Sequence, residues 1–119
     1  MSFGEKIREL RKAKGFNQRD LAEKVGIDFT YLSKLENDRF DRPPAEETIR
    51  ALARNLDANE EELILLANRI PSDWHKRIVS TPGLPEFLRA IKGRSLNKED
   101  WAKIRKIVES KEKRTEVDK

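Results

Sequence analysis

The stretch QRDLAEKVGIDFTYLSKL, residues 18–35, decides the fold of this chain. Apolar residues recur at helical spacing on both sides of Gly26, so that two short helices can each bury one face. The members of the two stripes are Leu21, Ala22 and Val25 before the glycine, and Leu32 and Leu35 after it. Glycine adopts a left-handed backbone without a Cβ clash, which a chain leaving one helix for a tight turn usually requires. We therefore predict a pair of crossing helices joined at Gly26.

The small side chain of Ala22 allows the second helix to cross closely over the first, and Asp28 is placed to cap that second helix. Two helices joined by such a tight turn are typical of a helix-turn-helix motif, in which the second helix is displayed at the surface. A displayed helix of this kind fits the major groove of DNA. The stretch therefore indicates a protein that reads DNA.

The chain has 119 residues, of which 36% are hydrophobic and 40% are charged. This length suits one compact domain with an extension, and the composition favours short helices around a small core. The net charge of +4 is unevenly spread. Residues 1–42 carry 10 Lys and Arg against 8 Asp and Glu, residues 43–67 carry 2 against 6, and residues 68–119 carry 14 against 8. Overall basicity permits DNA binding without indicating it, because most of the excess lies in the C-terminal part.

Several classes of function find no support in the sequence. Cysteine is absent, which excludes disulfides and thiolate metal sites, and His75 is the only histidine, so we expect no metal and no cofactor. Neither a nucleophile–base pairing nor a Gly-rich phosphate loop is evident, so we expect no enzyme activity. There is no apolar run of about 18 residues and no signal-peptide pattern, so we expect a cytoplasmic protein without a membrane partner.

Helical periodicity and end signals predict an all-α chain without strands. Five helices are expected in a DNA-binding domain of residues 1–69. They cover about 3–14, 18–25, 29–37, 44–56 and 60–67, with Pro44 opening the fourth after a loop. Three more, near 72–79, 85–92 and 98–110, are expected in a helical extension of residues 70–112. Residues 113–119 are expected to form a disordered tail.

Residues 7–67 resemble the XRE family, the helix-turn-helix domains shared by phage-type repressors and many bacterial regulators. The matching segments are IRELRKAKGFNQRDLAEKVGI (7–27), YLSKLEN (31–37) and TIRALARNL (48–56). The resemblance implies a five-helix, repressor-type domain and a DNA-binding transcriptional regulator. It further implies a homodimeric repressor that reads a pseudo-palindromic operator with its third helix in the major groove. The chain departs from the family at Asp38, where a glycine commonly follows Leu-Glu-Asn.

The third predicted helix must bury Leu32 and Leu35, so its opposite face is displayed. The residues of that face, by which the family reads bases, are Phe29, Thr30, Ser33 and Lys34. Lys34 can donate to guanine, Thr30 can hydrogen-bond to a base edge, and Phe29 can pack on a thymine methyl group. The alternatives are that Phe29 is partly buried against the second helix and that Lys34 contacts phosphate without choice of sequence.

Four further residues are expected to contact DNA phosphates: Asn17, Gln18, Tyr31 and Asn37. Asn17 and Gln18 lie at the start of the second helix, where free backbone N–H groups and the helix dipole favour an anion. The resemblance implies that both grip phosphate oxygens; their alternative role is to cap that helix. The Tyr31 hydroxyl can reach a phosphate from the side of the third helix, and by resemblance Asn37 contacts the backbone.

Glu36 directly follows the last core leucine, where a carboxylate facing DNA would be repelled. In the family this glutamate pairs with an arginine of the first helix, and Arg11 is the matching position. The resemblance therefore implies a structural salt bridge, Arg11–Glu36, that ties the first helix to the third.

The C-terminal half carries four large apolar residues in predicted helices, Trp74, Phe87, Trp101 and Ile104. One interpretation is that all four are core residues. The other is that Trp101 and Ile104 form part of a dimer interface together with Val108. The fifth helix is the alternative dimer interface. By resemblance, the extension is also a candidate site for a toxin or a peptidase, which would make the chain an antitoxin-type regulator. An adaptor without DNA binding is the remaining alternative, because residues 1–67 carry 12 Lys and Arg against 14 Asp and Glu.

Overall fold

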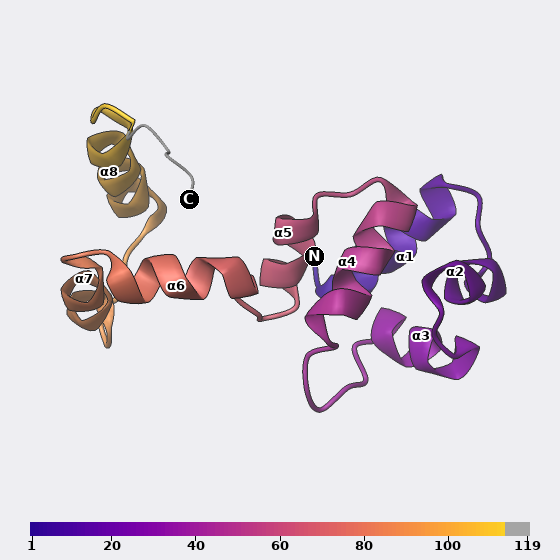
Figure 1. Ribbon diagram of the computed structural model, residues 1–119. Coiled ribbons are helices and arrows are strands. Elements are labelled where there is room, and N and C mark those ends of the chain that lie inside the picture. Colours follow the sequence, from indigo (N-terminus) through magenta and orange to yellow (C-terminus); the bar gives the residue numbers. More distant parts are fainter. Residues whose placement is uncertain (114–119) are drawn as a thin grey trace. The chain divides into compact units, whose positions relative to one another are not determined.

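The computed structural model describes residues 1–113, and every regular element in that part of the chain is an α-helix (Figure 1). The helices are α1 Phe3–Ala13, α2 Gln18–Val25, α3 Phe29–Glu36, α4 Glu46–Leu56, α5 Glu60–Leu66, α6 Ser72–Ser80, α7 Leu84–Ile91 and α8 Lys98–Glu109. The predicted all-α fold is therefore confirmed. None of the described helices is both long and apolar enough to cross a membrane. The chain divides into two compact units, Met1–Arg77 and the part that begins at Ile78.

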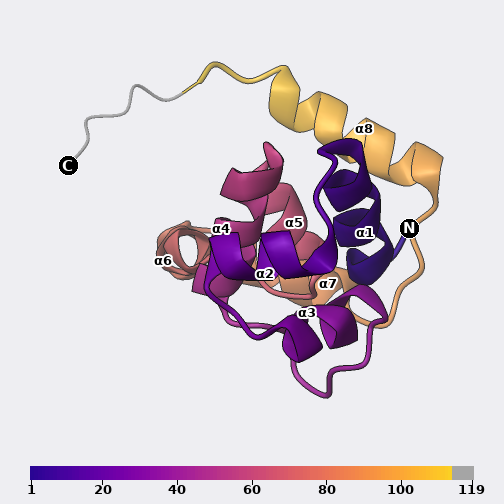
Figure 2. The same cartoon turned by 90° about the vertical axis from the view of Figure 1, so that its right-hand side faces the viewer.

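Helices α1 to α5 surround one hydrophobic core within the first unit (Figure 2). Its members are Phe3, Ile7, Leu21, Ala22, Leu32, Leu35, Ile49, Leu52, Ala53, Leu56, Leu63, Ile64 and Ala67. Helix α2 packs against both α3 and α4, and α1 also packs against α3 and α4. Burying a Leu or Ile side chain contributes about 1.5–3 kcal/mol, so this core holds the α2–α3 pair in a fixed geometry.

The ends of α2 are set by the residues that the sequence indicates. The side chain of Asn17 accepts a hydrogen bond from the Asp20 N–H over 2.8 Å, and Asp20 returns a bond to the Asn17 N–H in a capping box. Gly26 ends the helix with a φ of 85°, in the left-handed region. Asp28 is the N-cap residue of α3, but its side chain accepts no capping hydrogen bond.

Pro44 does not open the fourth helix, so that prediction is wrong. Helix α4 begins at Glu46, with Ala45 as its N-cap residue. Pro44 is fully buried, and its carbonyl oxygen accepts a hydrogen bond of 2.6 Å from Nε of Arg69, which follows α5. Pro44 therefore lies in the loop, two residues before α4 starts, and packs against a distant part of the chain.

The N-terminal end of α6 is held by an ion cluster centred on Arg50 of α4. The guanidinium of Arg50 lies 2.8 Å from a carboxylate oxygen of Glu46 and 2.7 Å from one of Glu60. Glu46 also accepts a hydrogen bond of 3.0 Å from the Ser72 N–H. The hydrogen bond from Arg50 lowers the pKa of Glu46 below its ordinary value of 4.5, against the raising effect of desolvation, and the bond to Glu60 raises the pKa of Arg50.

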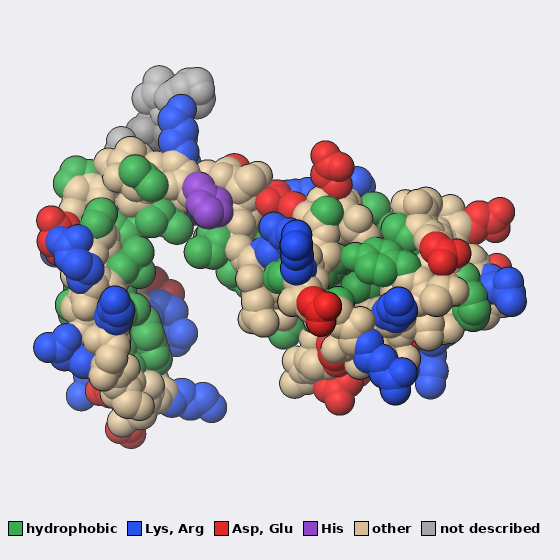
Figure 3. Space-filling view, turned by 90° about the horizontal axis from the view of Figure 1, so that it is seen from below, with side chains coloured by type: hydrophobic (Ala, Val, Ile, Leu, Met, Phe, Trp, Pro, Cys, Tyr) green, Lys and Arg blue, Asp and Glu red, His purple; other side chains and the backbone are tan. Residues whose placement is uncertain are grey.

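The extension has no core of its own within the described residues. No residue of α6, α7 or α8 is buried, so interpreting Trp74, Phe87, Trp101 and Ile104 as core is wrong. Trp101 is 43% exposed, and Phe87 is 37% exposed. In the space-filling view, hydrophobic side chains of the extension lie at the surface among Lys and Arg (Figure 3). The predicted tail falls almost entirely on residues 114–119, which lie outside the described part.

Candidate nucleic-acid interface

Helix α3 buries one face and displays the other. Leu32 and Leu35 are fully buried in the core, where α3 packs against α1 and α2. Of the predicted base contacts, Phe29, Thr30 and Lys34 are exposed and Ser33 is half-buried. Tyr31, a predicted phosphate contact, is half-buried and packs against the core. Helix α3 thus has a core face and a solvent-facing one, and three of the four predicted base contacts are exposed.

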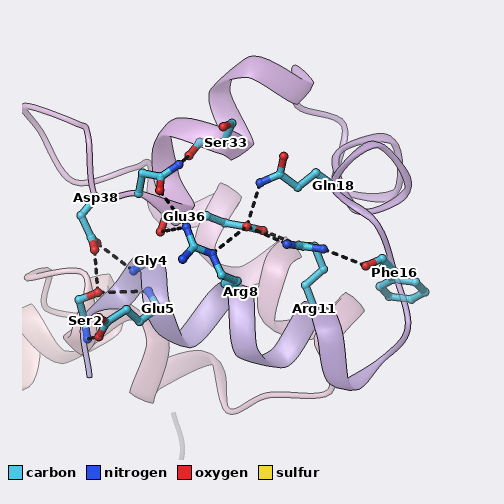
Figure 4. Close-up of polar contacts among 11 residues, drawn as sticks. Ser2, Gly4, Glu5, Arg8, Arg11, Phe16, Gln18, Ser33, Glu36 and Asp38 are labelled. Atoms are coloured by element: carbon cyan, nitrogen blue, oxygen red, sulfur yellow. Dashed lines mark hydrogen bonds and ion pairs between the residues drawn. The ribbon is translucent and has the colours of Figure 1, made fainter.

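The carboxylate of Glu36 is buried at the C-terminal end of α3 and is held by Arg11 of α1 (Figure 4). Nε of Arg11 donates to Oε2 of Glu36 over 2.7 Å, and Nη2 donates to Oε1 over 3.1 Å. Nη1 of Arg11 donates to the carbonyl oxygen of Phe16 over 3.0 Å. This two-pronged pair joins α1, the α1–α2 connection and α3.

Two further side chains converge on Glu36. Nε2 of Gln18, a predicted phosphate contact, donates to Oε1 of Glu36 over 2.9 Å. Nε of Arg8 lies 3.7 Å from the same oxygen, and Nη2 of Arg8 donates to Oδ1 of Asn37 over 2.8 Å. The buried carboxylate is therefore balanced by two guanidinium groups and one amide, which offsets its loss of hydration.

Arg8 is the member of this network that was not among the predicted site residues. Its position one turn before Arg11 places both side chains on the same face of α1, so helical spacing was the signal that could have found it. Asn37, held by Arg8, also donates from Nδ2 to the Ser33 carbonyl oxygen over 2.8 Å. Asn17, by contrast, is not part of the network and caps α2.

The first turn of α1 is fixed to the residue that follows α3 and its C-cap. The Gly4 N–H donates to Oδ1 of Asp38 over 2.9 Å, and Oγ of Ser2 donates to Oδ2 over 2.6 Å. Asp38 has a φ of 58°, in the left-handed region. The residue that replaces the usual glycine of the family thus keeps the glycine-like backbone and adds two hydrogen bonds to α1.

A displayed helix that crosses a supporting helix after a glycine turn defines a helix-turn-helix protein. The chain belongs to the helix-turn-helix domain family: a family model described as "Helix-turn-helix domain" matches residues 4–69, which span the five helices of the first unit. Within this family it is of the XRE type, as the sequence predicts.

Known relatives include the HTH-type transcriptional regulator SinR of Bacillus subtilis (strain 168). It is 28% identical to this chain over an alignment of 111 residues, and the match covers 82% of this chain and 99% of SinR. A crystal structure of SinR, the master regulator for biofilm formation, in complex with DNA is 31% identical. The match covers 52% of this chain and 97% of the SinR chain in that structure, with a TM-score of 0.48.

Two other solved structures are similar to this chain. The DNA-binding domain of the P22 C2 repressor is 28% identical, with a TM-score of 0.48, and the match covers 54% of this chain and 82% of that domain. A complex of the SinR and SinI proteins is 23% identical, with a TM-score of 0.51, and the match covers 92% of this chain and 99% of that chain. The last match shows likeness of fold.

Proposed function

We propose that this chain is a sequence-specific DNA-binding transcriptional regulator that acts in the cytoplasm, without enzyme activity, as a dimeric repressor. Helix α3 enters the major groove, and its exposed residues Thr30 and Lys34 contact base edges. The observation that carries this proposal is the buried Arg11–Glu36 pair, which joins the displayed helix to α1 and leaves the opposite face of α3 free. A helix held rigidly at its inner face can present base contacts at fixed positions.

The phosphate contacts follow from the same arrangement. An amide nitrogen carries two hydrogens, and Gln18 uses one of them on Glu36, so the second is left to donate to a phosphate oxygen. Asn37 accepts a hydrogen bond from Arg8 at the C-terminal end of α3. This contact places an amide and a guanidinium side by side, next to the DNA major groove that α3 would enter. The dipole of α2 adds to the attraction for phosphate near Asn17.

Fluorescence anisotropy on the full chain tests this function. DNA from upstream of its own gene is compared with a scrambled duplex across a salt series. We expect binding to the upstream DNA to exceed binding to the scramble by about 10³ or more and to weaken with salt. Lys34→Ala should lower this preference, whereas Lys24→Ala, an exposed lysine of α2, should leave it unchanged. Absence of binding to both duplexes at low salt would instead favour the adaptor.

We propose that the dimer forms through the extension, because α7 and α8 display apolar side chains that no core covers. Phe87, Leu88 and Trp101 are each about two-fifths exposed, and apolar surface of this kind marks an interaction site. Sedimentation of the full chain with Trp101→Glu is expected to show a monomer. If this variant remains a dimer, the exposed Leu65 and Leu66 of α5 are the alternative dimer interface, tested by the same substitution there.

The second candidate is an antitoxin-type regulator, and the same uncovered apolar face favours it. In that case the extension covers a toxin rather than a second copy of itself. The full chain would then sediment as a monomer alone and would form a complex with the product of a neighbouring toxin-like gene. Trp101→Glu would weaken the complex with the toxin but would leave the affinity of the monomeric chain for DNA unchanged.

A further inference from the structure

A residue outside the network around Glu36 lies against the other end of the displayed helix. The guanidinium carbon of Arg19, in the first turn of α2, lies 4.5 Å from the centroid of the Phe29 ring. Phe29 is the first residue of α3 and is 36% exposed. This separation is that of a cation–π contact, in which the positive group is attracted to the face of the ring.

Two consecutive residues of α2 therefore hold opposite ends of α3. Gln18 donates to Glu36, the last residue of α3, and Arg19 lies over Phe29, the first one. The first turn of α2 thus contacts both ends of α3 through its side chains, and Arg19 and Phe29 are both exposed. In a helix-turn-helix, the first helix of the pair crosses the DNA backbone while the second enters the groove.

The charge of Arg19 is not neutralised by a carboxylate among the described residues. Glu23, one turn further along α2, is placed for an ion pair, yet no such pair forms with Arg19. Asp20 is engaged in the capping box with Asn17. Arg19 is exposed, so a cation remains available to an anion that approaches the α2–α3 surface.

We propose that Arg19 is a DNA phosphate contact whose guanidinium is held in position by the Phe29 ring; this inference rests on the DNA-binding function proposed above. A guanidinium attracted to an aromatic ring still carries N–H donors that match the geometry of phosphate oxygens. Stacking in the free protein also reduces the conformational freedom that is lost on binding. Phe29 thereby supports a backbone contact from the helix that reads bases.

The test uses the full chain and a duplex selected from a random DNA library, with a scrambled duplex beside it, in a salt series. Arg19→Ala is expected to weaken binding to both duplexes by the same factor of about ten and to reduce the slope of log affinity against log salt by about 0.9. Arg19→Lys is expected to keep the salt slope but to recover only part of the affinity, because an ammonium lacks the planar stacking geometry.

A double-mutant cycle tests the part played by Phe29. In the Phe29→Leu background, Arg19→Ala is expected to weaken binding to the scrambled duplex by clearly less than tenfold, because the guanidinium is no longer held in place. An NMR measurement without DNA gives an independent readout. The Arg19 Nε–Hε resonance should show a ring-current shift that disappears in Phe29→Leu. Strictly additive effects and an unshifted resonance would overturn the role of Phe29.

Lys24→Ala is the matched control, since Lys24 lies over the Phe16 ring at 5.2 Å at the other end of the same helix. It is expected to leave affinity and salt slope unchanged. If wild-type protein binds DNA but Arg19→Ala binds equally well with the same slope, the Arg19 contact is overturned and the proposed function stands. A loss confined to the selected duplex would overturn the phosphate assignment in favour of a base contact. If the random library yields no binding duplex and wild-type protein does not bind the scrambled duplex at low salt, both proposals fall.

Discussion

The backbone N–H of Gly4 donates to Oδ1 of Asp38 over 2.9 Å, so that the first turn of α1 is capped by a residue that follows α3. Oγ of Ser2 donates to the second oxygen of the same carboxylate. A negative charge at the start of a helix is stabilised by the helix dipole and by its unpaired N–H groups. Together with Arg11–Glu36, this contact fixes the C-terminal end of the displayed helix to α1 at two points.

Gly4→Ala should destabilise the fold although alanine is the better helix former. A Cβ at position 4 would lie 2.5 Å from the carbonyl oxygens of both Leu35 and Glu36 and 2.8 Å from Oδ1 of Asp38. Because backbone atoms cannot move away as a flexible side chain does, α1 must separate from α3, at a cost of about 1–3 kcal/mol. Chemical denaturation of the full chain measures this loss as a lower midpoint.

The exposed end of α1 provides the control for helix propensity. Ala13→Gly, in the last turn of the same helix, should lower stability by about 0.5–1 kcal/mol through backbone entropy alone. At a helix position with space for a Cβ, a change from glycine to alanine would instead raise the stability by a similar amount. A Gly4→Ala protein that is more stable than wild type would therefore contradict the close approach of α1 to α3.

The three substitutions Asp38→Gly, Asp38→Asn and Asp38→Ala should separate backbone strain from hydrogen bonding. Asp38→Ala keeps the left-handed backbone and loses both acceptors, so it should lower stability most, by about 1–3 kcal/mol. Asp38→Gly loses the acceptors but relieves the strain, and Asp38→Asn keeps one carbonyl acceptor near Gly4. Melting temperatures should fall in the order wild type, then glycine or asparagine, then alanine. An alanine variant as stable as wild type would mean that the carboxylate does not cap α1.

Local patterns predicted the helices of the first unit because each signal acts over a few residues. Gly26 ends α2 and Asn17 begins it through contacts within one turn. The face of α3 follows from the spacing of Leu32 and Leu35, whose burial leaves Thr30 on the other side. Capping and periodicity are properties of the segment itself, so the sequence carries them without knowledge of the rest of the fold.

The remaining features depend on residues far apart in the chain. Pro44 looked like the start of a helix, but its carbonyl oxygen is taken by Arg69 from beyond α5. The contact of Arg19 with Phe29 depends on how α2 and α3 cross, so neither composition nor helical periodicity predicts it. In the extension, Trp101 has the spacing of a core residue yet is exposed. Periodicity shows which face of a helix is apolar, but it does not show which part of the protein or which partner packs against that face.

Glu36→Ala should weaken both folding and DNA binding. Removal of the carboxylate leaves Arg11 buried without its partner, a change that typically destabilises by about 3–5 kcal/mol. Loss of the shared acceptor also frees Gln18 and changes the direction of α3. Thermal unfolding should show a lower melting temperature, and anisotropy on the selected duplex a lower affinity. Unchanged values of both would contradict this role of Glu36.

Two controls distinguish the buried pair from a general loss of charge. Glu23→Ala removes an exposed carboxylate from α2 and should change stability by no more than about 0.5 kcal/mol. The double variant Arg11→Met with Glu36→Leu removes both buried charges and should recover much of the stability lost in Glu36→Ala. Its DNA affinity should recover less, because Gln18 still lacks the partner that positions it.

The stability of the first unit should decrease in acid partly through Glu46. Arg50 lowers the pKa of the folded Glu46 carboxyl below the ordinary value of 4.5. The stabilising contribution is therefore fully present above 4.5 and is lost as the pH falls through the lower, folded value. Glu46→Gln should be less stable than wild type at neutral pH, and the difference should shrink in acid. Denaturation midpoints between about pH 3 and pH 7 measure this, with Glu47→Gln, an exposed neighbour in the same turn, as control. A difference that stays constant across this range would mean that the Glu46 carboxylate does not stabilise the folded protein through its contact with Arg50.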